Sequence, residues 1–312
     1  MGRLGRQESI YWDPEVFMPD VVWLAVVFFA CVLILCFVAV YYAPSLVAGP
    51  RINDIRQRYS LTVQVGAKNF GRLVTAGVVF LAGSAFTVLV CYLFGRLAHV
   101  LQDPIDWTVF RWFEARQLDG WSRVWRVLTN VGGLRQTRWV ALVGILFFPV
   151  AYGLSRRRWA TPLLTLLGGV VSEYYLQSLL EAIVHRGHPP TTMGSYPSGG
   201  MARIMVIYGL FVFMTFRLWP TRNSRVRMCA WCLVILCAAV EMYARIYNLE
   251  HWATDVLGGL LFGTMLLMVM CRVFDILDRP SELATKPVSE ALTRESTLRG
   301  GGRPQGSASS KS

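Results

Sequence analysis

Charged residues are scarce in this sequence. Asp, Glu, Lys and Arg make up 16% of its 312 residues, whereas soluble domains carry roughly a quarter. Hydrophobic residues make up 54%, and the mean hydropathy is +0.43. This balance excludes an ordinary soluble domain and predicts a protein that is integral to a membrane.

Two further features are missing. We find no internal repeat, which disfavours a transporter built from repeated halves. No small-residue cleavage site closes the first apolar block, which is also too long for the core of a signal peptide. We therefore expect this block to remain in the protein as a membrane helix.

The apolar residues form seven blocks, most of them about the length that a helix needs to cross the hydrocarbon core. Lipid offers no partner for backbone polar groups, so each block is expected to be helical. The third block is short and contains Pro149. We predict an all-α, polytopic membrane helix bundle of about seven transmembrane helices. The blocks are 21–43, 73–95, 139–154, 161–184, 201–218, 228–248 and 252–277.

All seven cysteines lie in or at the edge of these blocks. Cys229 and Cys232 have the spacing of a redox or metal pair, but there is no second pair. We expect the cysteines to pack as small hydrophobic residues, and we expect no metal and no cofactor. Gly259 and Gly263 predict a close contact between helices inside the bundle.

The net charge of +12 does not predict nucleic-acid binding, because of how the charge is distributed. If the connections alternate sides, 19 of the 31 Lys and Arg residues fall on one side and 12 on the other. The side with 19 is expected to be cytoplasmic. Residues 1–20, 96–138, 185–200 and 249–252 then lie outside the cytoplasm.

Two polar segments flank the predicted bundle. Residues 103–128 mix aromatic residues with arginines, which favours an amphipathic helix in the membrane interface or an ordinary capping loop. Residues 285–312 are rich in Gly, Ser and polar residues, which predicts a disordered cytoplasmic tail.

Ionisable residues within apolar helices indicate functional groups, because a charge in lipid is unfavourable. Glu173, Gln177 and Glu181 recur every four residues, so they are predicted to face inward. The predicted topology brings residues from the loop after them and from the last three helices to one membrane face. They are Arg186, His188, Ser198, Arg245, His251 and Asp255.

These residue types suit the binding of an anion. The N–H groups of Gly199 and Gly200 open a predicted helix that Ser198 can cap, and a helix N-terminus favours negative charge. Arg245 can hold two anion oxygens. Asp255, one turn from His251, can fix the imidazole tautomer. The alternatives are that His251 only caps its helix and that Arg245 only pairs with Glu241.

The motifs resemble those of the membrane-bound type 2 phosphatidic acid phosphatases of the vanadium haloperoxidase superfamily. That family carries Lys-x6-Arg-Pro, Pro-Ser-Gly-His and Ser-Arg-x5-His-x3-Asp. In this sequence the third motif is Ala244-Arg245-x5-His251-x3-Asp255. The second is Pro197-Ser198-Gly199-Gly200, and the first is Glu181-x6-His188-Pro189.

The resemblance covers residues 73–277 and implies a six-helix phosphatase-like domain, to which helix 21–43 is an addition. It implies a phosphohydrolase at the outer membrane surface that uses a lipid phosphate or polyprenyl diphosphate. His251 would form a phosphohistidine and Asp255 would orient it. The phosphoryl oxygens would be held by Arg245, Ser198, Gly199, Gly200 and, in place of the lost motif arginine, Arg186.

The departures from the motifs leave several interpretations open. In the family, the histidine that Gly200 replaces protonates the leaving group, so His188 or His185 is expected to do so here, or the substrate is a diphosphate. A phosphotransferase is a further possibility. The rival interpretation is a catalytically silent relative that binds anionic lipid or supports envelope assembly. The sequence does not determine the oligomeric state.

Overall fold

The structure is a computed structural model that describes residues 14–46, 62–63, 65–156, 159–191, 194–221 and 223–278. Seven segments of these residues are long and apolar enough to cross a membrane, which confirms the predicted multi-pass helix bundle. The predicted tail 285–312 and most of segment 1–20 lie outside the described residues.

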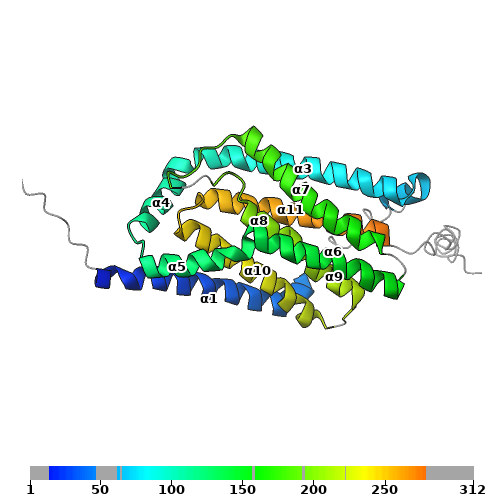
Figure 1. The fold of residues 1–312 in the computed structure, drawn as a ribbon, viewed down its shortest axis with the longest axis horizontal. Helices are drawn as coiled ribbons and strands as arrows, with labels where there is room; N and C mark the ends of the chain where they lie inside the picture. The colour runs from blue at the N-terminus through cyan, green and yellow to red at the C-terminus, as the bar shows by residue number, and fades with distance from the viewer. Residues whose placement is uncertain are drawn as a thin grey trace, which may run out of the picture.

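The seven spans run along the long axis of the molecule (Figure 1). Five of them are single long helices: α1 (Pro14–Leu46), α3 (Arg72–Val100), α7 (Ala160–Val184), α10 (Ser224–Tyr247) and α11 (Ala253–Asp278). The third span joins α5 (Asp119–Leu128) through the 3-10 turn η2 (Thr129–Gly132) to α6 (Leu134–Arg156). The fifth span joins α8 (Gly199–Arg203), the π-helical η3 (Ile204–Tyr208) and α9 (Gly209–Leu218).

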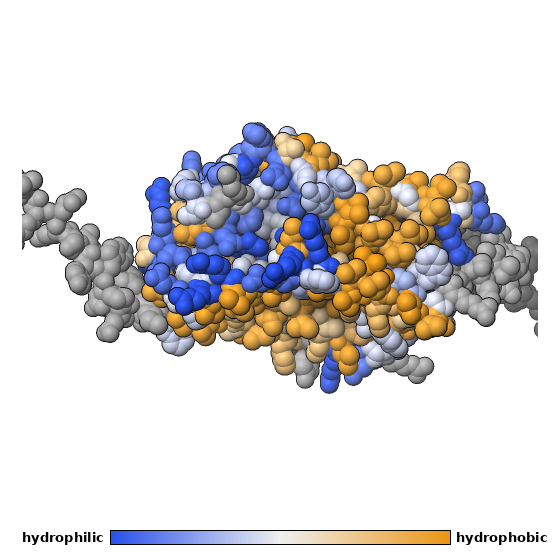
Figure 2. All heavy atoms as spheres, viewed as in Figure 1, coloured by the Kyte–Doolittle hydropathy of each residue, from blue (hydrophilic) through white to orange (hydrophobic). Residues whose placement is uncertain are grey.

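Helix α11 lies at the centre of the bundle and packs against α3, α7 and α8. Its apolar side chains Phe262, Leu266 and Phe274 are fully buried. On the outside of the bundle, large side chains such as Leu93 and Leu154 are exposed, as expected of helices that face lipid. Figure 2 shows hydrophobic residues over much of the body and hydrophilic residues gathered towards the end that contains α4 and α5.

The predicted contact of Gly259 and Gly263 is confirmed as internal packing. A Cβ atom on Gly263 would lie 2.8 Å from Cα and the backbone oxygen of Ala202 in α8. A Cβ on Gly259 would lie closer than 3.0 Å to the backbone oxygen of Ser198. The two glycines therefore let the start of α8 lie directly on α11.

Segment 103–128 forms two short helices where a single amphipathic helix was predicted. The π-helical η1 (Gln102–Asp106) leads into α4 (Trp107–Glu114), and α5 begins after a turn. The aromatic side chains Phe113 and Trp125 are buried against Tyr243 of α10. The aromatic side chains thus pack against the bundle, because burial of large rings against α10 is favourable.

Candidate active site

The candidate site lies at the end of the bundle where α10 ends and α8 and α11 begin. After α7, the chain turns at His185, whose φ of 49° is left-handed, and runs across the N-terminus of α11. Several hydrogen bonds hold this connection. The N–H of Ser198 donates to the Asp255 backbone oxygen at 3.0 Å, Trp252 Nε1 donates to Gly187 at 2.8 Å, and the Tyr196 hydroxyl donates to Cys91 at 2.6 Å.

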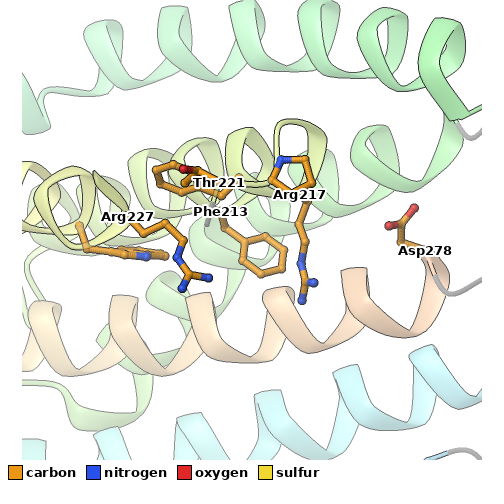
Figure 3. Close-up of a pocket in the computed structure, with 8 residues that line it drawn as sticks. Phe213, Arg217, Thr221, Arg227 and Asp278 are labelled. Atoms are coloured by element: carbon orange, nitrogen blue, oxygen red, sulfur yellow. The ribbon is translucent and has the colours of Figure 1, made fainter. Parts of the chain in front are cut away.

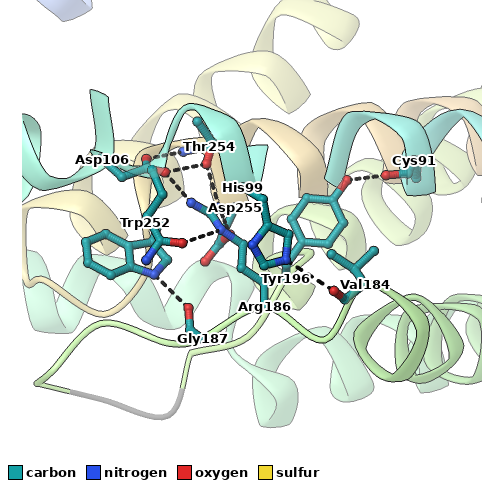
Figure 4. A network of polar contacts seen from close by, with 11 residues as sticks. Cys91, His99, Asp106, Val184, Arg186, Gly187, Tyr196, Trp252, Thr254 and Asp255 are labelled. Atoms are coloured by element: carbon teal, nitrogen blue, oxygen red, sulfur yellow. Dashed lines mark hydrogen bonds and ion pairs between the residues drawn. The ribbon is translucent and has the colours of Figure 1, made fainter. Parts of the chain in front are cut away.

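Arg186 lies at the centre of a buried charge network (Figure 4). Its guanidinium donates to Asp106 and Asp255, and also to Thr254 Oγ1 at 2.6 Å. Arg186, Asp106 and Asp255 have side chains that are at most 1% exposed. Thr254 in turn donates to Asp106 from its hydroxyl at 2.7 Å and from its N–H at 3.0 Å. The network therefore ties η1, the connection after α7 and the start of α11 together.

This arrangement does not fit the predicted role of Arg186 as a phosphate ligand. Its Nη1 and Nη2 donate to two buried carboxylates, and its Nε donates to Gln102 at 3.4 Å. An arginine enclosed by two carboxylates is already neutralised, so it has little attraction left for a phosphoryl group. In this structure Arg186 binds Asp255, and its role as a phosphate ligand stays a prediction.

His251 lies in the turn between α10 and α11, with part of its surface exposed. Burial of the ring, with Arg245 and Arg203 nearby, lowers its pKa from 6.5 to about 3. The imidazole is therefore neutral at any ordinary pH, as a nitrogen nucleophile must be.

The predicted hydrogen bond between Asp255 and His251 is not formed in this structure. Asp255 Oδ1 accepts from Arg186, whereas Asp255 Oδ2 and His251 Nδ1 are both buried without a hydrogen-bond partner. Buried polar atoms without partners are rare in folded proteins. Two of them on residues one helical turn apart would satisfy each other if the side chains rotated together.

Arg245 is held by two carboxylates. Its Nε donates to Glu241 at 2.8 Å, and its Nη1 pairs with Glu250. Its Nη2 lies beside the start of α8, 3.3 Å from where a Cβ on Gly200 would stand. The ion pair with Glu241, one of the two alternatives for Arg245, is therefore present, and Nη2 still faces the helix N-terminus.

Ser198 precedes the first turn of α8, but its side chain does not cap the helix as predicted. Its Oγ is buried and has no hydrogen-bond partner. Gln177 and Arg203 lie next to Gly199, since a Cβ placed there would approach their side-chain atoms within 2.8 Å. The hydroxyl, the first N–H groups of the helix and Arg245 Nη2 thus all belong to the start of α8 or lie beside it, and a helix N-terminus favours an anion.

The inward-facing stripe on α7 is shorter than predicted. Glu173 is buried with Arg203 Nη1 3.8 Å from its carboxylate, and Gln177 donates to the Pro197 oxygen at 3.4 Å. Glu181 is exposed. A four-residue step overshoots one helical turn by about 40°, so two steps turn Glu181 about 80° away from Glu173.

The two histidines predicted as alternative proton donors lie on the exposed connection. His185 and His188 are both exposed, and Nδ1 of His188 lies 2.9 Å from the backbone oxygen of Pro189. The structure does not bring His188 into the buried cluster around His251. Local backbone geometry decides where these side chains point, and motif spacing does not reveal it.

Sequence reasoning missed Asp106, Thr254 and Glu250. Asp106 is 80 residues from Arg186 in the chain, so motif spacing could not pair the two. Within the described ranges, His, Cys, Asp and Glu form no cluster that could hold a metal ion. A separate pocket of about 620 Å³ lies at the ends of α9 and α11 and is lined by Arg217, Arg227 and aromatic rings (Figure 3).

The comparisons with known proteins fit this geometry. A sequence profile described as the PAP2 superfamily matches residues 177–278, which include Ser198, Arg245, His251 and Asp255. No curated protein matches the sequence. The fold is similar to the crystal structure of a transmembrane PAP2 type phosphatidylglycerolphosphate phosphatase from Bacillus subtilis, with a TM-score of 0.52 and 20% identity. That similarity covers 63% of this chain and 97% of the other. Residues 177–278 are thus similar to the PAP2 superfamily, and the helix bundle has the fold of a transmembrane PAP2 type phosphatase.

Proposed function

We propose that the protein is a lipid phosphate or polyprenyl diphosphate phosphatase, or a phosphotransferase, that works through a phosphohistidine on His251. One observation carries this proposal. Two buried atoms, His251 Nδ1 and Asp255 Oδ2, have no hydrogen-bond partner, and their residues are four apart in the chain. A binding protein has no need of an imidazole that a carboxylate can orient, whereas a nucleophile does.

The reaction begins when the phosphoryl group binds at the N-terminus of α8. Its oxygens accept hydrogen bonds from Ser198 Oγ, from the amides of Gly199 and Gly200, and from Arg245 Nη2. Nδ1–H of His251 donates a hydrogen bond to Asp255 Oδ2, which leaves the unprotonated Nε2 as the nucleophile. Nε2 attacks phosphorus, and water or an acceptor alcohol later displaces the phosphoryl group from the nitrogen.

The proposed location is the extracytoplasmic face of a cell membrane, with the C-terminus in the cytoplasm. The distribution of Lys and Arg supports this orientation. In the structure, the described start of α1 and the helices α4 and α5 lie at one end of the molecule, and the last turns of α11 lie at the other (Figure 1). A site at the membrane surface suits a substrate whose tail stays in the lipid.

Phosphate release from a panel of lipid phosphates and diphosphates by detergent-purified protein tests the proposal. His251→Ala should abolish turnover, and Arg96→Gln, at an exposed position of α3, should not change it. An acid-labile phosphoprotein should appear in the wild type and not in His251→Ala. If neither turnover nor a phosphoprotein is seen with any substrate or alcohol acceptor, the silent lipid-binding relative becomes the better interpretation.

A further inference from the structure

The carboxylate of Glu241 lies between two glycines from different elements. Its side chain is fully buried on α10. A Cβ on Gly132 or on Gly200 would lie closer than 3.0 Å to Glu241 Oε1, a distance that real Cβ atoms essentially never show. Neither position can therefore carry a side chain while Glu241 lies there. The space next to Gly200, where the family motif has its histidine, is filled by an acid from another helix.

Hydrogen bonds fix this carboxylate. Oε2 accepts from the Gly132 N–H at 3.2 Å and from Thr129 Oγ1 at 3.3 Å. Oε1 accepts from Arg245 Nε at 2.8 Å. Oε2 is thus hydrogen-bonded to the turn η2, and Oε1 points towards Arg245 and the start of α8. This second oxygen borders the place proposed for the phosphoryl group.

Cleavage of an alkyl phosphate by a nitrogen nucleophile needs a proton on the departing oxygen, because an alkoxide is a poor leaving group. The atoms nearest to a Cβ on Gly199 or Gly200 belong to four side chains: Gln177, Arg203, Glu241 and Arg245. An amide is not an acid, and a guanidinium keeps its protons. Glu241 is the member of this group that can hold and release a proton.

We propose, on the basis of the proposed function, that Glu241 protonates the leaving oxygen. A phosphate bound to Arg245 adds negative charge beside the carboxylate, which favours uptake of a proton from water. As the bond between His251 Nε2 and phosphorus forms and the P–O bond breaks, Glu241 gives this proton to the departing alcohol. Water then attacks phosphorus, breaks the P–N bond and returns a proton to Glu241, which restores both residues.

The test compares leaving groups in Glu241→Gln, which keeps the size of the side chain. With an alkyl phosphate, we expect kcat/KM to fall by about 10²–10⁴-fold. With p-nitrophenyl phosphate, whose leaving group needs no proton, we expect less than a tenfold loss. Glu250→Gln is the matched control, because Glu250 also binds Arg245 but is not among the side chains that approach Gly200. It should slow both substrates by a similar factor.

Equal losses on both substrates in Glu241→Gln, or no loss, would overturn the assignment. A wild-type protein that cleaves neither substrate would refute the proposed function itself. A second pair of variants covers the case in which Glu241→Gln does not fold. Gly200→His should be inactive because its side chain would meet Glu241, and adding Glu241→Gly should restore cleavage of the alkyl ester. If the double variant is no more active than Glu241→Gly alone, the proposal fails.

Discussion

Replacing Arg186 by glutamine removes a cation that lies between two buried carboxylates. Asp106 and Asp255 both accept hydrogen bonds from this guanidinium, and none of the three side chains is more than 1% exposed. Glutamine can keep one hydrogen bond but brings no charge. The variant therefore leaves two like charges buried close together, with water excluded from both.

Breaking a buried pair by removing one partner typically costs about 3–5 kcal/mol. Here two carboxylates lose their partner, so we expect a loss of unfolding free energy at the upper end of this range. At about 2 °C per kcal/mol for a chain of this size, the midpoint of thermal unfolding should fall by roughly 10 °C. Asp106→Asn in the same chain should recover part of the loss, because it removes one of the stranded charges.

Thermal unfolding of the detergent-purified protein, followed by tryptophan fluorescence, measures this difference. Arg96→Gln should stay within about 0.5 kcal/mol of the wild type, as exposed substitutions usually do. The reasoning is refuted if Arg186→Gln unfolds at the wild-type temperature while KM for the substrate rises several-fold. That result would show Arg186 as the phosphate ligand that the sequence predicted.

Three further predictions concern the site. The pKa of His251 is about 3 in the folded protein, so the unfolded chain binds more protons than the folded protein between pH 3 and 6.5. The free energy of unfolding should therefore fall on acidification over this range, by up to about 1.4 kcal/mol per pH unit. In His251→Asn this fall should be smaller. Ser198→Ala removes a buried hydroxyl without a partner, so we expect an unchanged or higher melting temperature and at least a tenfold lower kcat/KM. Gly259→Ala should lower stability by about 1–3 kcal/mol and displace Ser198, whereas Gly77→Ala in α3 meets no atom within 4 Å and should not destabilise the protein.

Each of these has a clear contrary result. Parallel melting curves against pH for the wild type and His251→Asn would show that the buried imidazole does not titrate as inferred. A lower melting temperature without loss of kcat/KM in Ser198→Ala would assign that hydroxyl to folding. Equal effects of the two glycine substitutions would show that α8 does not depend on its close approach to α11.

The membrane bundle could be predicted from the sequence because lipid imposes a single rule on each apolar segment. A helix that satisfies its own backbone needs a fixed length of apolar residues, and the described residues contain seven such segments, with the short third block lengthened by α5. This rule does not decide where segment 103–128 lies. Its aromatic residues fit a membrane interface and a protein interior equally well, and the packing of Phe113 and Trp125 against rings of α10 and α1 decides between the two.

The site was predicted in part for a related reason. Their four-residue spacing at the start of the last apolar block identified His251 and Asp255, and topology brought Ser198 and Arg245 to the same end of the bundle. The partner of Arg186 could not be found in this way, because Asp106 lies in a separate connection. The prediction that Glu181 faces inward was wrong because a spacing of four residues was treated as one full turn of the helix.

The balance of charge in the site links substrate binding to proton transfer. Three guanidiniums lie around the start of α8 and α11: those of Arg186, Arg203 and Arg245. Each already has a carboxylate within 4.0 Å. Five carboxylates face these three cations: Asp106, Asp255, Glu173, Glu241 and Glu250. A phosphate cannot join such a group as an additional anion without strong repulsion, unless a carboxylate moves away or takes up a proton. Of the five, Glu241 directs its oxygen at both Arg245 and Gly200, so the incoming charge acts on it most directly. Binding of the substrate then produces the acid that its own cleavage requires, which a histidine at position 200 would otherwise have to supply.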